Sequence, residues 1–168
     1  MPQQPHQARE AAPADPLHWC PSGSPDRPEA VVLGVRSGPD GRVDYLAAPL
    51  PAAEVVAALP DGVPPTRVLR FASHCVSGCA NRVGTACGLA DRMLALPSAE
   101  GAPVPRCHLR AHCKWWHQTG VAACHRCPAV ATAPLADDTL SALVADPSTT
   151  REHLAAHLAA TGPGAAGR

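Results

Sequence analysis

The chain has 168 residues, which suits one domain with tails, and its acidic and basic residues balance to a formal net charge of zero. This balance argues against a nucleic-acid partner and against a charged membrane-surface role. Aromatic residues make up only 3% of the chain, which contains twenty prolines and thirteen glycines. A core of Leu, Val and Ala buries little area, so we expect a cross-link or a metal to help hold the fold.

The two ends of the chain differ from the rest. Residues 1–16 are polar and Pro-rich and predict a disordered arm, and residues 162–168 predict a tail. The N-terminal stretch lacks the basic and apolar regions of a signal peptide, and no apolar run reaches the roughly 20 residues of a membrane span. We therefore expect a cytoplasmic protein with reduced cysteines, disulfides being the alternative.

Residues 17–161 are predicted to form a single α+β metal-binding domain. Its first part, residues 17–73, begins with a predicted β-hairpin, in which strands 30–35 and 43–47 flank a Gly- and Pro-rich turn at 38–41. A short helix over 51–60 and a strand over 68–73 follow. This part of the domain is expected to be a small hairpin, helix and strand unit.

The second part, residues 74–132, is rich in cysteine and is expected to be irregular, helical and nucleated by metal. Helices are predicted over 90–96 and over 106–118, the latter ending at Gly120. Residues 133–161 predict two more helices. The first follows Asp137 and Asp138, and the second is opened by a capping box of Thr149 and Glu152.

The eight cysteines divide into two groups of four. The first cysteine group, spaced C-x5-C-x10-C-x2-C, consists of Cys107, Cys113, Cys124 and Cys127. The second cysteine group joins a C-x3-C-x7-C trio to a residue 55 positions earlier, and consists of Cys75, Cys79, Cys87 and Cys20. Four thiolates is the ligand number of tetrahedral zinc and of an iron–sulfur cluster alike. All eight are therefore candidate metal ligands.

The spacings of the first cysteine group favour a [4Fe–4S] cluster over zinc. Structural zinc sites usually take their ligands as two close C-x2-4-C pairs, and only Cys124 and Cys127 form such a pair. The longer spacings suit a larger object, and Pro128 gives the Cys-Pro ending of ferredoxin-type runs. A second cluster in the second cysteine group is a hypothesis, and Zn²⁺ remains the alternative cofactor.

The residues beside the cysteines allow several interpretations. Trp115 and Trp116 are either core residues or a shield that keeps water from a cluster. Cationic side chains would offset the negative charge of the thiolates; they are Arg106, Arg110, Lys114 and Arg126. Five histidines adjoin cysteines and are expected to be mostly peripheral, with His74 as the replacement if Cys20 is not a ligand. These are His74, His108, His112, His117 and His125.

The pair Cys124 and Cys127 also has the spacing of a dithiol redox site. Such a site normally follows a strand and opens a helix, and here no strand is predicted before Val121. Pro128 directly after the second cysteine also argues against it. Dithiol catalysis is therefore a minor alternative.

Two stretches resemble known cysteine-rich proteins. CHLRAHC, residues 107–113, is similar over seven residues to the C-P-V-R-x-x-C end of the WhiB-like iron–sulfur regulators, but their upstream C-x-x-C and Gly-Trp-Gly-Gly turn are missing. CGLADR (87–92) and CKWWHQTGVAACHRCP (113–128) resemble a group of small bacterial cysteine-rich proteins regarded as iron–sulfur binders. This resemblance covers residues 71–132. It implies a cluster and no particular reaction.

Two classes of function fit a cluster of this kind. One is electron transfer, and the other is a redox- or gas-responsive accessory role; both imply a protein partner such as a redox enzyme or a regulator. The alternative is a structural zinc-binding interaction module without redox activity. We single out no catalytic residue, and an enzyme is expected only if one cluster has three cysteine ligands and an open iron.

Overall fold

The computed structural model describes residues 19–38, 40–98 and 101–162. The expected arm at 1–16 and nearly all of the expected tail lie outside these residues. Helices and an antiparallel sheet are both present, which confirms the α+β class. None of the described helices is long and apolar enough to cross a membrane.

The N-terminal part contains a four-stranded antiparallel sheet of order β1-β4-β2-β3. Its strands are β1 (Trp19–Cys20), β2 (Val31–Ser37), β3 (Arg42–Pro51) and β4 (Leu69–His74). The β2–β3 hairpin is confirmed, and its turn uses Gly38 and Gly41 at positive φ values of 69° and 61°. Only glycine adopts this conformation freely.

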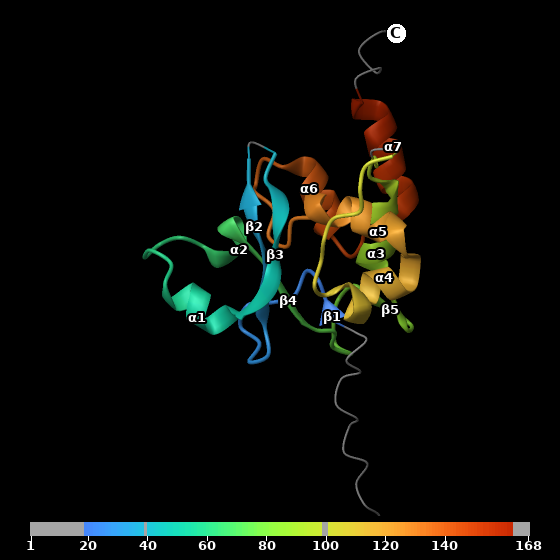
Figure 1. Cartoon of the computed structure of the whole chain (residues 1–168). Coiled ribbons are helices and arrows are strands. Elements are labelled where there is room, and N and C mark those ends of the chain that lie inside the picture. The colour runs from blue at the N-terminus through green and yellow to red at the C-terminus, as the bar shows by residue number, and fades with distance from the viewer. Residues whose placement is uncertain (1–18, 39, 99–100, 163–168) are drawn as a thin grey trace, which may run out of the picture.

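Both faces of the sheet are covered. On one face Val32 and Phe71 pack with α1 (Ala52–Ala57), and α2 (Pro65–Val68) leads into β4. On the other face Leu33 and Ala72 belong to the main hydrophobic core. Neighbours in a strand point to opposite faces, so β2 and β4 serve both cores. The sheet therefore lies between α1 and the cysteine-rich helical half (Figure 1).

The helical half consists of short elements. A small hairpin of β5 (Arg82–Val83) and β6 (Ala86–Cys87) precedes α3 (Gly88–Arg92) and the 3-10 turn η1 (Met93–Ala95). Then come η2 (Arg110–His112), α4 (Lys114–Thr119), α5 (Val121–Arg126) and η3 (Cys127–Ala129). The chain ends with α6 (Thr139–Ala145) and α7 (Arg151–Thr161).

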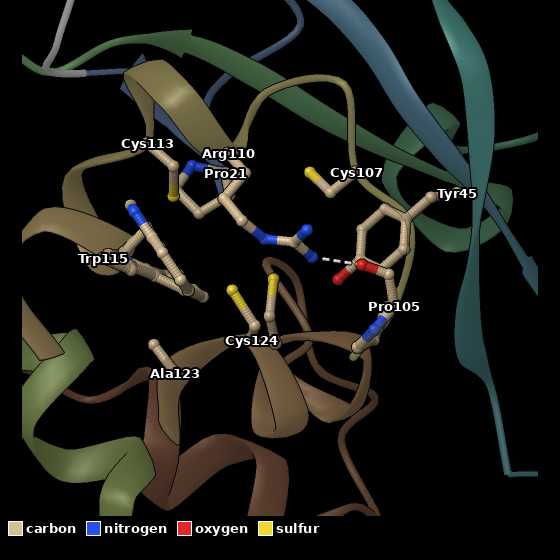
Figure 2. A pocket seen from close by; sticks show the side chains of 11 residues that line it. Pro21, Tyr45, Pro105, Cys107, Arg110, Cys113, Trp115, Ala123 and Cys124 are labelled. Atoms are coloured by element: carbon tan, nitrogen blue, oxygen red, sulfur yellow. Dashed lines mark hydrogen bonds between the residues drawn. The ribbon is translucent and has the colours of Figure 1, made fainter. Parts of the chain in front are cut away.

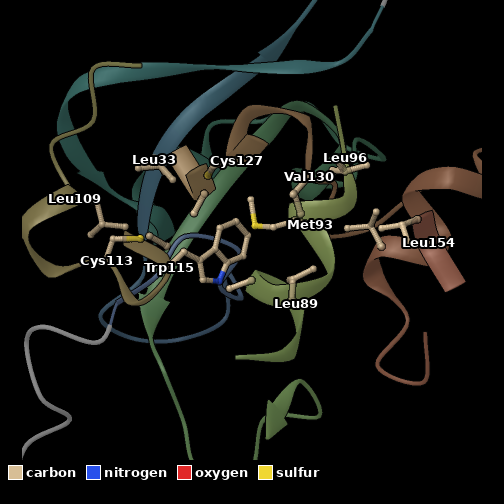
Figure 3. Close-up of a cluster of buried hydrophobic side chains, with 14 residues drawn as sticks. Leu33, Leu89, Met93, Leu96, Leu109, Cys113, Trp115, Cys127, Val130 and Leu154 are labelled. Atoms are coloured by element: carbon tan, nitrogen blue, oxygen red, sulfur yellow. The ribbon is translucent and has the colours of Figure 1, made fainter. Parts of the chain in front are cut away.

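Trp115 occupies the middle of the main core and is 1% exposed. Figure 3 shows its indole among Leu33 from the sheet, Met93 from η1 and Cys127 from η3. In a chain with so few aromatic residues, this one side chain joins the sheet to the helices. The core interpretation of Trp115 therefore holds, and a shielding role is compatible with it.

Two boundaries expected from the sequence are wrong. The helix predicted over 106–118 is broken at Cys113, whose ψ of 126° is extended, and only α4 beyond it is α-helical. The last helix is capped by Thr150, whose side chain accepts from the N–H of His153, so the capping box of Thr149 and Glu152 does not form. Thr149 is instead buried.

Candidate metal centre

The four cysteines of the first cysteine group line one cavity between the sheet and the helices. Cys107 comes from the loop before η2 and Cys113 from the break before α4. Cys124 lies in α5, and Cys127 opens η3. Figure 2 shows the side chains of Cys107, Cys113 and Cys124 around this space. Residues twenty positions apart thus meet because short helices turn back at Gly120, whose φ is 65°.

Backbone N–H groups are directed at two of these sulfurs. The Cys113 thiol accepts from the N–H groups of Trp116 and Trp115, and the Cys107 thiol accepts from that of Leu109. Burial nevertheless raises the pKa of Cys113 to about 12, and it raises the pKa of Cys107 as well. Without metal these thiols stay protonated, whereas N–H donors at the sulfur favour the thiolate that a metal binds.

Arg70 places a buried positive charge beside the first cysteine group. Its side chain is 1% exposed and lies in β4. The guanidinium donates to the carbonyl oxygens of Pro21, Cys127 and Val130 at 2.6, 3.1 and 2.7 Å. No carboxylate of the described residues forms an ion pair with it. Buried charges are normally paired, so an anionic group beside Cys127 would be stabilised by this cation.

Arg110 supplies a second cation, inside the cavity. Its guanidinium extends between the cysteines toward Pro105, whose carbonyl oxygen it bonds (Figure 2). It also hydrogen-bonds the Cys124 thiol, which offsets part of the rise that burial causes in the pKa of Cys124. The guanidinium carbon lies 5.5 Å from the centroid of the Trp116 ring. Arg110 thus places a positive charge beside the sulfurs.

Three buried polar atoms in the cysteine-rich half have no hydrogen-bond partner among the described residues, and two of them belong to side chains that line the cavity. Nε1 of Trp115 and Nε of Arg110 are buried donors that make no hydrogen bond to any described residue. Nε2 of His108 is also buried and unpartnered, and burial lowers the pKa of His108. Such groups are rare in native folds, and an acceptor-rich ligand such as a sulfide would satisfy the donors.

Tyr45, from β3, brings a hydroxyl to the same wall. It lies close enough to Cys127 for a hydrogen bond, and burial together with the neighbouring thiols raises its pKa strongly. The phenol therefore remains a donor. The donor set around the sulfurs is two guanidiniums, an indole, a phenol and backbone N–H groups, and it fits an anionic thiolate-bound centre.

The second cysteine group does not line the first cavity. Cys20 is brought to the end of β4 by the pairing of β1 with β4, close to Cys75. Cys79 and Cys87 follow on the turn and hairpin after it. The structure thus brings the first group to one cavity, and it places the residues of the second group on neighbouring segments.

The predicted cations and histidines lie in different environments, and most of them lie outside the cavity. Of the four predicted cations only Arg110 lines the cavity; Lys114 bonds the carbonyl of Thr85, and Arg126 bonds that of Leu96. His74 stacks edge-on against Trp19 with its Nδ1 3.7 Å from Glu29 Oε1. His112 and His117 are exposed.

All eight cysteines are free thiols in the described residues. Within those residues, no three Cys, His, Asp or Glu side chains converge closely enough to hold a single metal ion. The four thiols of the first cysteine group line a common cavity.

Sequence reasoning missed Arg70 and Tyr45. Arg70 had a detectable signal, because an arginine in the middle of an apolar strand, VLRFAS, is rarely buried without a partner. Tyr45 had none, since a tyrosine in a hairpin strand is ordinary. Comparison of the chain with protein-family models, with curated proteins and with solved structures gives no match.

Proposed function

We propose that the first cysteine group binds an iron–sulfur cluster, [4Fe–4S], and that the protein transfers electrons. The observation that supports this most is the convergence of four cysteines on one cavity that is lined by the guanidinium of Arg110 and by no carboxylate, while the buried Arg70 donates to the Cys127 sulfur. A cluster bound by four thiolates is anionic in every oxidation state, and cations and N–H donors around it stabilise the added electron.

The proposal requires the side chain of Arg110 to move when a cluster binds. Its guanidinium fills part of the space between the sulfurs, so a cluster would displace it toward the cavity rim. Arg110 is only half-buried, and the face of Trp116 lies beside it. The side chain can therefore swing outward and still lie against the cluster as a cation.

A partner would reach the cluster through an open groove next to the cavity. The groove and the cavity share Tyr45 and Pro105 as walls. Charged side chains of both signs line the groove, namely Arg42, Arg106, Asp40 and Asp44. Mixed charge of this kind suits a transient protein partner, for example a redox enzyme or regulator. The proposal includes a cytoplasmic location, where thiols stay reduced.

A redox- or gas-responsive role is the second candidate, favoured by one observation. Cys113 and Cys127 belong to the main hydrophobic core. Loss of a cluster to oxygen or nitric oxide would leave these core thiols without the object that orders them. The helical half would then loosen, which gives a partner a changed surface to recognise.

The test is metal and acid-labile sulfide per chain in protein purified without oxygen, with a visible spectrum. Cys124→Ser, at a half-buried position, is expected to lose about four irons and four sulfides relative to the wild type. Arg126→Gln, in the same helix but away from the cavity, is the matched control and should keep them. Colourless protein with zinc and no sulfide would show instead a zinc-stabilised module.

A second measurement distinguishes electron transfer from a responsive role. Electron transfer predicts a reversible redox titration with unchanged metal content. A responsive role predicts that exposure to oxygen or nitric oxide removes iron and makes residues 107–128 sensitive to protease. A cluster that neither titrates reversibly nor is lost on exposure would contradict both roles.

A further inference from the structure

We propose that Cys20, Cys75, Cys79 and Cys87 hold a second metal centre of the iron–sulfur class, with Gln118 as the residue that positions it. The class of metal rests on the function proposed for the first cysteine group. The placement of the ligands rests on contacts that, apart from the bridge between Trp19 and Cys113, involve no residue of the first cavity.

The first contact brings Cys20 to the segment that holds Cys75, although the two residues are 55 positions apart in the sequence. Trp19 lies opposite His74, and Cys20 lies opposite Ser73, in the antiparallel pairing of β1 with β4. Cys75 is the next residue after β4 ends. Gly23 then approaches β4 so closely that a Cβ on it would lie 2.4 Å from the Ser73 nitrogen. The segment that holds Cys20 is therefore fixed against the strand that delivers Cys75.

The second set of contacts joins the other two cysteines. The N–H of Arg82 donates to the carbonyl of Cys79 at 3.0 Å, which makes a tight turn. Arg82 is also the residue opposite Cys87 in the β5–β6 hairpin. Cys79 and Cys87 are thus held to the same residue, one by a turn and one by strand pairing.

Gln118 fixes Cys87 from the side of α4. Its Oε1 accepts from the Cys87 N–H at 2.8 Å, and its Nε2 donates to the Cys87 carbonyl at 3.0 Å. The backbone N–H and the carbonyl of one residue, Cys87, are thus both satisfied by a single amide side chain, as a neighbouring strand would do. Two hydrogen bonds from one side chain fix the backbone of Cys87 and therefore the direction of the Cys87 sulfur.

The contacts then close into a ring. Cys113, the residue just before α4, forms a parallel bridge with Trp19, next to Cys20. The ring runs from β1 to β4, through the Cys79 turn and the small hairpin, to Gln118 and back along α4. The four cysteines of the group lie along this ring, and none of them lines the first cavity.

The thiols of the group also lie near one another. The Cys20 thiol is within electrostatic reach of the thiols of Cys87 and Cys75, and the Cys75 thiol is within reach of those of Cys87 and Cys79. Lys114 and Arg82 lie near Cys75 as cations. Neighbouring thiols with cations beside them suit a metal bound as thiolate.

His74 is a poorer fourth ligand than Cys20. Its Nδ1 lies 3.7 Å from Glu29 Oε1, and its backbone N–H donates to the same oxygen at 3.0 Å. Its ring also meets Trp19 at a centroid distance of 4.5 Å. These contacts hold the imidazole to the sheet edge. Cys20 makes no comparable side-chain contact with a carboxylate.

The experiment compares iron and acid-labile sulfide per chain in anaerobically purified wild type, Cys79→Ser and Cys124→Ser. We expect about eight irons in the wild type and about four in each variant, with different electron paramagnetic resonance signals remaining after reduction. Wild-type iron content in Cys79→Ser would overturn the second centre and leave the proposed function intact. Iron retained in Cys124→Ser but lost in Cys79→Ser would support the second centre and contradict the first.

Gln118 is tested separately, because a cysteine variant can fail to fold. Gln118→Ala should lower the iron of the second centre or shift its resonance signal, and leave the signal of the first centre unchanged. Gln118→Glu keeps the acceptor for the Cys87 N–H and should recover part of the loss. Val121→Ala, exposed on the next helix, is the matched control. Identical signals in all three variants would overturn the positioning role.

Discussion

The guanidinium of Arg70 donates to two atoms of one residue, the carbonyl oxygen of Cys127 at 3.1 Å and its sulfur at 3.5 Å. Arg70 belongs to the sheet, and Cys127 belongs to the cysteine-rich half. The same guanidinium lies 5.7 Å from the centroid of the Trp115 ring. A single buried cation therefore joins the two parts of the domain at the cysteines.

Replacement of Arg70 should destabilise the fold strongly. In Arg70→Met the carbonyl oxygen of Pro21 loses its donor, and one unsatisfied buried group costs about 1–3 kcal/mol. The carbonyl oxygens of Cys127 and Val130 each lose one bond but keep a second donor, the Val130 N–H and Arg36 respectively. We expect a loss of about 1–3 kcal/mol, measured by urea unfolding of the metal-free protein. Arg67→Met, at an exposed position three residues earlier, is the control. Equal midpoints for the two variants would show that Arg70 has no structural role.

Arg110 should tune the reduction potential of the first centre. Because a cation near a cluster stabilises its reduced form, Arg110→Gln should lower the midpoint potential by an amount on the order of tens of millivolts. Arg126→Gln removes the same charge from a side chain that bonds Leu96 and Ala122 and does not line the cavity. A spectroelectrochemical titration that gave both variants the same shift would contradict the assignment.

The two adjacent tryptophans should differ in their contribution to stability. Trp115 is buried in the main core, so Trp115→Ala is expected to cost about 3–5 kcal/mol. Trp116 is only partly buried and packs at the core edge beside Arg110, so Trp116→Ala should cost about 1–2 kcal/mol. Chemical denaturation measures the loss of unfolding free energy in each variant. A larger loss for Trp116→Ala than for Trp115→Ala would contradict the central position of Trp115 in the core.

The metal-free protein should lose stability as the pH rises. Burial raises the folded-state pKa of Cys20 and Cys113 from the ordinary 9.0 to about 12. The unfolded chain ionises these thiols first, so above about pH 9 it binds fewer protons than the folded protein, and the free energy of unfolding decreases. The stabilisation is complete below about pH 9 and is lost toward about pH 12.

Urea midpoints of the metal-free protein at about pH 8 and about pH 10 test this dependence. Cys113→Ser removes one of the two thiols and should weaken the decrease. The metal-loaded protein should show a smaller decrease, because its ligands are already thiolates. A midpoint that stayed constant in the metal-free wild type would contradict the burial of these thiols.

The β2–β3 hairpin, strand β4 and helix α6 follow from local signals in the sequence. Alternating apolar residues, the glycines of the 38–41 turn and the cap Asp138 all act over a few positions. The division of the cysteines into two groups also follows from spacing. What local reasoning misses is the break at Cys113, because the residues before and after it have helical composition, and only tertiary contact with Trp19 makes it extended.

The surroundings of the cysteines depend on contacts that are distant in sequence. Arg70 reaches Cys127 across 57 positions, and Gln118 reaches Cys87 across 31. Spacing can indicate that cysteines act together. It cannot indicate which donors face them, because those donors come from strands and helices whose packing is set by the whole core.

The short strand β1 has a consequence for assembly. β4 has six residues and is buried, and on one side the described backbone pairs with it through the two residues of β1 and through the Gly23 N–H, which donates to the Phe71 carbonyl. A metal centre that includes Cys20 would anchor β1 there, and its loss would free the strand. The uncovered edge of β4 would then be open to pairing with another chain. We therefore expect metal-depleted protein to aggregate through this edge, while loaded protein stays dispersed.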